Sequence, residues 1–263
     1  MMVIFCHEMK MNWKNLIIWT LCVGGLCFGC ILLYTSLEDS IQEMADAYSR
    51  LGAMSTALGM DKMSLATLDG FYATEIALMH GLGGAMFAAI TGITLLSKEE
   101  TGHTAEFLNV LPLGRKNIFI QKYAALAGHI LLFNAVCFLM HLSGYLAMNE
   151  HIPLKELLLY FLIQLLMQLE TGSLCFAISA FTRKSLTGAG LGLVLLLYAA
   201  DLMCRIVPAL EGLKYITPFY YSGAPDIFTG NSPSPVMVVL GCAVTVISFL
   251  AAFFQYCTKD LAA

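Results

Sequence analysis

Long apolar runs alternate with short polar segments along the whole chain, and most charged residues lie between the runs. A helix needs about 20 predominantly apolar residues to cross the hydrocarbon core of a bilayer, and six runs reach that length. We therefore predict an all-α polytopic membrane protein with six transmembrane helices in a single transmembrane domain. The predicted spans are residues 15–37, 76–97, 123–147, 157–181, 186–208 and 235–256.

Two long segments are predicted to face the outer side of the membrane. In the first, residues 38–75, apolar side chains recur at helical spacing over 41–51. They predict a short helix that either covers the outer mouth of the bundle or takes part in substrate handling. A second short helix is expected near 65–68. The other outer segment, 209–234, is rich in Pro, Gly and aromatic residues, so it is expected to be irregular.

The orientation of the spans follows from Lys and Arg, because cytoplasmic loops of membrane proteins carry an excess of these residues. With the N-terminus inside, nine of the 14 Lys and Arg residues fall on the inner side and five on the outer side. We predict that both termini are cytoplasmic. Residues 3–14 mix apolar and charged side chains, which predicts a helix in the membrane interface with Trp13 at headgroup depth.

Composition supports a membrane protein and disfavours other classes. Of the 263 residues, 59% are hydrophobic and 12% are charged, against about 45–50% and about 25% in soluble domains. This disfavours a disordered chain and an ordinary soluble enzyme. The nine cysteines fall mostly in apolar runs, where cysteine behaves as a small hydrophobic residue. The net charge of −4, without a basic stripe, gives no indication of nucleic-acid binding.

Catalytic and cofactor-binding motifs are missing from the sequence. It contains no G-x-x-x-x-G-K-[ST] phosphate loop, no H-E-x-x-H zinc motif and no G-x-S-x-G nucleophile elbow. His80, His129 and His141 show no metal-ligand spacing. We therefore predict that the chain is not an enzyme and that it holds no metal or cofactor of its own.

A few polar residues inside the spans are candidates for a transport pathway, because such groups are costly in lipid. Asp201 and Arg205 are spaced to pair along one helix face, either as a self-neutralised pair at the rim or as a substrate contact. Glu170 has no partner nearby in the sequence. It is the best candidate for a functional carboxylate in the membrane, and the alternative is a hydrogen-bonded helix contact.

Smaller features of the spans suit contacts between helices. Gln164, Gln168 and Thr171 share one face of the fourth span, and such a polar stripe either joins helices or lines a pathway. The pairs Gly25-x-x-x-Gly29 and Gly188-x-x-x-Gly192 form small-residue faces that favour close helix packing.

The inner loop 98–122 predicts a short amphipathic helix. Two acidic residues open it, where the helix dipole favours negative charge, and a proline ends it. Physical chemistry leaves two uses for its apolar patch, docking into a groove of a soluble partner or lying on the lipid surface. The residues concerned are Glu99, Glu100, Glu106, Phe107, Leu108 and Pro112.

This loop resembles the loop after the second span of ABC-2 type permeases. The shared pattern is Glu99-Glu100-x-Gly102-x-x-x-Glu106-Phe107-Leu108-x-x-x-Pro112-x-x-Arg115-x-x-Ile118-x-x-x-Lys122. The N-terminal arm and the first outer loop are also similar to those of small bacterial members. One departure is His103-Thr104-Ala105, which looks like an insertion of one residue before Glu106.

The resemblance implies a permease subunit of an ATP-driven exporter in the bacterial cytoplasmic membrane. Such a permease works as a homodimer or heterodimer and pairs with separate ATPase subunits, which bind the ATP and Mg²⁺. The inner loop would then supply the coupling helix that enters a cleft on the ATPase. The residues implied in coupling are Glu99, Glu100, Gly102, Glu106, Phe107, Leu108, Pro112 and Arg115, with Arg183 and Lys184 from the second inner loop.

The alternative function is a secondary transporter driven by protons or sodium, which would use Glu170 as the coupling carboxylate. In either case the possible pathway residues are Glu170, Gln164, Gln168, Asp201 and Arg205. The substrate stays open among drug, peptide, lipid and ion, because an apolar cavity leaves no sequence motif.

Overall fold

The computed structural model describes residues 2–37, 40, 41, 43, 52, 55, 59, 60, 62–102, 114–182, 184 and 186–258. These residues form helices and turns and contain no strand. Six helical stretches are long and apolar enough to cross a membrane, which confirms the predicted all-α architecture. They are α1 (Val3–Leu33), the continuous run of α4 (Leu68–Phe71), η2 (Tyr72–Ile76) and α5 (Ala77–Leu95), then α8 (Arg115–Met148), α9 (Leu154–Phe181), α10 (Thr187–Ile206) and α13 (Pro235–Thr258).

The arm and the first span form a single helix, α1, rather than two separate elements. No Pro or Gly interrupts residues 3–23, so nothing breaks the helix between them. Its first turn is held by α8, where Oε1 of Gln121 accepts hydrogen bonds from the N–H groups of Ile4 and Phe5 at 2.9 and 3.2 Å. The 31 residues of α1 span about 46 Å at 1.5 Å each, so part of it must extend beyond a hydrocarbon core of about 30 Å.

The helix of the second span begins at Leu68, earlier in the chain than the predicted start at residue 76. Residues 41–51, where a helix was predicted, lie almost wholly outside the described residues. The short helix expected near 65–68 is instead the start of the second span. Thr67 caps it, because its hydroxyl accepts a hydrogen bond from the N–H of Gly70 at 3.1 Å.

The prediction of an irregular outer segment 209–234 is wrong. This segment contains the 3₁₀-helix η3 (Pro208–Tyr215) and the short helices α11 (Pro218–Tyr221) and α12 (Ala224–Phe228). Each of the three begins with a proline in its first two positions, where the fixed φ angle suits a helix start. Thr217 anchors α11 to α10, because its hydroxyl donates to the carbonyl of Leu197 at 2.7 Å.

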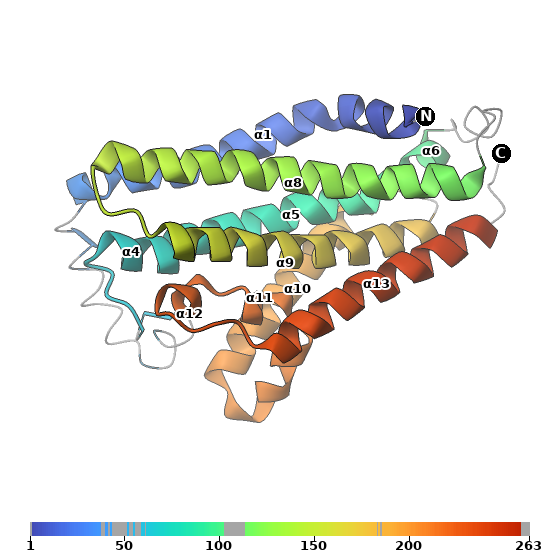
Figure 1. Cartoon of the computed structure of the whole chain (residues 1–263). Coiled ribbons are helices and arrows are strands. Elements are labelled where there is room, and N and C mark those ends of the chain that lie inside the picture. Colours follow the sequence, from blue (N-terminus) through green and yellow to red (C-terminus); the bar gives the residue numbers. More distant parts are fainter. Residues whose placement is uncertain are drawn as a thin grey trace.

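Helix α9 lies at the centre of the bundle and packs against α5, α8, α13, α11 and α12 (Figure 1). Helix α1 runs along α8, and α10 packs against α5. The start of α1, the short helix α6 (Lys98–Thr101) and the end of α13 share one end of the bundle, at the right of Figure 1. We call it the α6 end. At the opposite end lie α4, α12 and the connection between α8 and α9.

The closest glycine-mediated crossing joins α5 to α9 and not the helices whose glycine pairs stood out in the sequence. A Cβ atom on Gly92 would lie 2.3 Å from the carbonyl oxygen of Gly172. By contrast, a Cβ on Gly29, Gly188 or Gly192 would meet no atom within 4 Å among the described residues. Gly92 and Gly172 are 80 positions apart in the chain, so sequence spacing could not reveal their contact.

Gly92→Ala should therefore destabilise the permease. The added methyl group must push α5 and α9 apart, and overpacking of this kind costs about 1–3 kcal/mol. Gly25→Ala is the matched control, because its Cβ would lie at an ordinary contact distance of 3.8 Å from Cε of Met140, and alanine favours a helix interior over glycine by up to about 1 kcal/mol. Thermal unfolding of the purified variants in detergent measures the difference. Equal melting temperatures for the two would contradict the close crossing.

Candidate functional site

Four charged side chains meet at the α6 end of the bundle. We call Glu8, Lys98, Glu99 and Lys122 the charge cluster. The Lys98 ammonium donates a hydrogen bond to Glu8, and the Lys122 ammonium donates to Glu99. Lys122 also donates to the carbonyl oxygen of Leu95 at 2.7 Å, and its Nζ lies 3.4 Å from Oε1 of Glu8. The cluster therefore joins α1, the end of α5 with α6, and the start of α8.

Burial makes these contacts obligatory. The side chains of Lys122 and Glu8 are 0% and 2% exposed, while Lys98 and Glu99 reach the surface in part. A charge removed from water needs partners of opposite charge, and loss of one partner from a buried pair is strongly destabilising. Two carboxylates and two ammonium groups balance here. Glu99 and Lys122 belong to the loop pattern seen in the sequence, and Glu8 belongs to the N-terminal arm, but the sequence did not reveal that these groups are partners.

A neighbouring contact ties α9 to the same end. The hydroxyl oxygen of Ser179 accepts hydrogen bonds from the N–H groups of Leu96 and Ser97, at 3.3 and 3.1 Å. These two residues follow α5 directly and precede α6. The segment that leads into the inner loop is thus fixed from three sides, by α1, α8 and α9.

The structure describes only part of the set expected to couple to an ATPase. Glu99 belongs to the charge cluster, Gly102 is exposed just after α6, Arg115 is the first residue of α8, and Lys184 is exposed. Glu100 lies in α6. Outside the described residues lie Glu106, Phe107, Leu108, Pro112 and Arg183.

Glu170 has a partner that the sequence did not reveal. The hydroxyl group of Tyr221 in α11 donates a hydrogen bond to Oε2 of Glu170 at 2.7 Å, and Glu170 is 4% exposed. On the other side, a Cβ on Gly241 of α13 would lie 2.7 Å from the same oxygen. Glu170 therefore sits at the junction of α9, α11 and α13, which is the arrangement of a hydrogen-bonded helix contact.

The polar stripe on α9 also makes contacts between and within helices. Gln168 and Asn134 of α8 bond reciprocally, with the Asn134 amide donating to Gln168 Oε1 at 2.6 Å and the Gln168 amide donating back at 3.4 Å. The hydroxyl of Thr171 donates to the carbonyl of Met167 at 2.9 Å. Gln164 bonds to the outer segment instead, through the carbonyl of Ser222.

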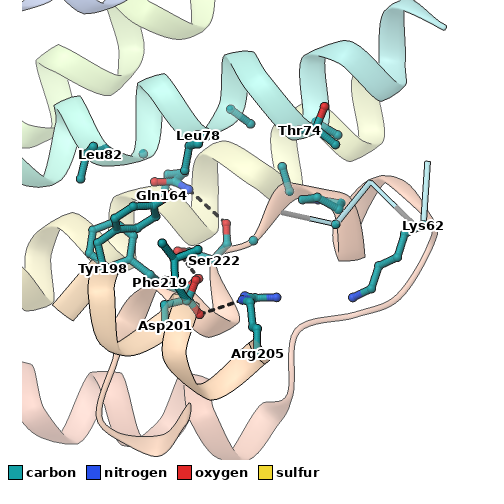
Figure 2. A pocket seen from close by; sticks show the side chains of 18 residues that line it. Lys62, Thr74, Leu78, Leu82, Gln164, Tyr198, Asp201, Arg205, Phe219 and Ser222 are labelled. Atoms are coloured by element: carbon teal, nitrogen blue, oxygen red, sulfur yellow. Dashed lines mark hydrogen bonds and ion pairs between the residues drawn. The ribbon is translucent and has the colours of Figure 1, made fainter. Parts of the chain in front are cut away.

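A pocket lies between the helices α11 and α12 and the halves of α5, α9 and α10 that are away from the α6 end (Figure 2). Asp201 and Arg205 line it together with Gln164 and Lys62. The expected pair along α10 is present, because Nε of Arg205 donates to Oδ1 of Asp201 at 2.9 Å. A second ion pair joins Lys62 to Asp226 at 2.6 Å. The pocket thus gathers three of the five possible pathway residues, Gln164, Asp201 and Arg205, and adds Lys62, which the sequence did not suggest as a pathway residue.

Two histidines that looked unrelated in the sequence lie together in the core. The rings of His80 and His141 meet edge to face, with centroids 5.3 Å apart. His141 Nδ1 bonds to the hydroxyl of Tyr72 at 2.7 Å, and His80 Nδ1 bonds to that of Tyr160 at 3.1 Å. Among the described residues, no group of three or more His, Cys, Asp or Glu side chains could hold a metal ion.

Comparisons with known proteins place this architecture. No curated protein matches the chain. The family model described as ABC-2 family transporter protein matches residues 2–261, which is nearly the entire sequence. Together with its six membrane-spanning helices, this match shows that the chain belongs to the ABC-2 family and is the multi-pass membrane permease of an ABC-type transporter.

Proposed function

We propose that this permease forms a dimer and is driven by separate ATPase subunits, which bind ATP and Mg²⁺ and dock on the inner loop 98–122. ATP would close the ATPase pair, the loop would transmit that movement to the spans, and a cavity between the two permeases would open outward. The observation that carries the proposal is the buried charge cluster at the base of this loop.

The cluster supports transmission because it makes the base of the loop stiff. A partner that pushes on the loop moves the spans only if the loop is joined firmly to them. Lys98 and Glu99, at the start of the loop, bond to Glu8 of α1 and to Lys122 of α8. Lys122 closes the loop at its far end, so both ends of the loop meet in one cluster.

The coupling residues proposed for this loop follow from the sequence pattern. Glu99, Glu100, Gly102 and Arg115 flank its centre. Glu106, Phe107, Leu108 and Pro112 form the centre, with Arg183 and Lys184 in the second inner loop as further contacts. The α6 end is proposed to face the cytoplasm of a bacterial cell, since both termini and most Lys and Arg residues fall on that side.

Open packing faces support the dimer. Along α5, Met79, Met86 and Ile90 stay at least partly exposed, while α1 packs on one side of this stripe and α10 on the other. A Cβ atom added to Gly29 of α1 or to Gly192 of α10 would meet no atom of another helix within 4 Å in the described part of the chain. Small residues allow the close approach of helices in membranes, so a second permease copy suits these faces.

The Glu170→Gln variant distinguishes an ATP-driven permease from the alternative function, an ion-coupled transporter. The glutamine side chain can still accept the hydrogen bond from Tyr221, so the helix contact is retained. We expect ATP hydrolysis and transport by the reconstituted complex to stay within about twofold of the wild-type values and to resist a proton ionophore.

Two results together would contradict the ATP-driven function. The Glu170→Gln variant would fold normally but lose all transport, and the wild type would transport without ATP and stop when the ionophore is added. Glu170→Ala serves as the control for structure. It leaves the Tyr221 hydroxyl unpaired in a buried site, which costs about 1–3 kcal/mol, so it should lower the melting temperature where Glu170→Gln does not.

A further inference from the structure

The pocket between α5, α9, α10, α11 and α12 contains a buried hydrogen-bond acceptor that has no partner among the described residues. Gln164 is 2% exposed, and its amide nitrogen donates to the carbonyl of Ser222 at 3.1 Å. A carbonyl can only accept, so this bond fixes which end of the amide is nitrogen. Oε1 of Gln164 then has no hydrogen-bond partner among the described residues. Gly81 of α5 lies close to this amide, because a Cβ there would be 3.4 Å from Oε1 of Gln164, and both residues line the pocket.

Three charged side chains, Asp201, Arg205 and Lys62, line the pocket between Gln164 and the pocket mouth. Figure 2 shows Gln164 near Tyr198 and Phe219, then Asp201 and Arg205, and Lys62 farthest out. Arg205 is held in place by its bond to Asp201, by a bond from its guanidinium to the carbonyl of Tyr220 at 3.1 Å, and by stacking over the Tyr220 ring at 4.5 Å.

The two ends of the pocket therefore differ in chemistry. The inner end offers acceptors, Oε1 of Gln164 and the carboxylate of Asp201, which is 6% exposed. The outer end offers cations, Arg205 and the partly exposed Lys62, whose ion pair with Asp226 can exchange with a ligand. Leu78 and Leu82 add apolar walls along the α5 side.

We propose that this pocket binds a zwitterion that carries a primary ammonium group next to a phosphate. The ammonium N–H groups would bond to Gln164 Oε1 and Asp201, and the phosphate would meet Arg205 and Lys62. Phosphoethanolamine has this chemistry, either as a free molecule or as a lipid headgroup. The pocket lies within one chain, so this assignment does not rest on the proposed dimer or on ATPase coupling.

Binding to the purified full-length permease without ATP tests the proposal, with phosphoethanolamine and phosphocholine as matched probes. Phosphocholine keeps the phosphate and the positive charge but lacks N–H donors, so it cannot bond to Gln164. We expect phosphoethanolamine to bind at least tenfold more tightly than phosphocholine by titration calorimetry. Equal affinity for the two, or binding of neither probe in free or lipid form, would overturn the proposal.

Variants assign the binding to this pocket. Gln164→Met should weaken phosphoethanolamine binding about tenfold and abolish the preference over phosphocholine, and Lys62→Met should weaken both probes about threefold. Lys214→Met is the control, because Lys214 lies in η3 and does not line the pocket. Unchanged affinity in both pocket variants would contradict the assignment. If Gln164→Met does not fold, Lys62→Met and the comparison of probes on the wild type decide.

Short-chain lipids with the same two headgroups distinguish the source of the ligand. If the lipid alone raises the melting temperature, the ligand is a membrane lipid. If the free headgroup binds equally well, the ligand is a soluble molecule. Both results support the zwitterion site, whereas stabilisation by both lipids to the same extent would count against it.

Discussion

Lys122→Met is expected to produce the largest loss of stability of any single substitution in the charge cluster. Lys122 is fully buried, and its ammonium group contacts Glu99, Glu8 and the carbonyl of Leu95. Its removal takes one of the two positive charges out of the cluster, and breaking a buried ion pair in this way costs about 3–5 kcal/mol. The melting temperature in detergent and the amount of protein inserted in membranes should both fall sharply.

Two further variants test whether charge is the cause. Lys116→Met removes an exposed lysine from the same helix, so it should behave as the wild type. Lys122→Met combined with Glu99→Gln restores a neutral cluster that keeps the Lys98–Glu8 pair, so it should recover part of the lost stability. Two results would show that the charge cluster does not stabilise the α6 end. One is equal melting temperatures for Lys122→Met and Lys116→Met, and the other is a double variant less stable than Lys122→Met alone.

Phe107→Ala combined with Leu108→Ala should separate the permease from its ATPase. We propose that these two apolar side chains dock in a groove of the ATPase, where their burial is worth on the order of 3–5 kcal/mol at most, before association costs. The copurified ATPase should therefore fall at least tenfold, as measured by quantitative immunoblot. The amount of inserted permease should not change, because the two residues lie outside the six long helices.

Glu106→Ala is the companion variant. A charge at the rim of an interface contributes more to orientation than to affinity, so this substitution should lower ATP hydrolysis more than ATPase binding. If the loop lies on lipid instead, the Phe107 and Leu108 double variant should retain any bound ATPase at the wild-type level.

The sequence was sufficient for features that depend on local periodicity. Hydropathy alone located the six spans, because each must supply a long apolar surface to lipid. The Asp201–Arg205 pair was also predictable, since residues four apart lie on the same helix face. The extent of α1 and the start of the second span were missed, because a continuous helix needs only the absence of a breaker and can run past the apolar segment.

Long-range contacts could not be predicted in the same way. Glu8 bonds to residues of α6 and α8, and Glu170 bonds to Tyr221 of the outer segment. Nothing in the residues near Glu8 or Glu170 indicates these partners, because they depend on which helices become neighbours. The pocket lined by Gln164 and Lys62 belongs to the same class, since it forms only after α11 and α12 have packed against α9 and α12 has packed against the second span.

Native mass spectrometry of the tagged permease, purified in mild detergent from its own membranes, tests the central claim most directly. The proposed function predicts an assembly of two permease chains with two ATPase chains, which gains mass on addition of ATP and Mg²⁺. Permease that is present at its normal level and fully folded, but carries no ATPase chain under these conditions, would contradict the claim.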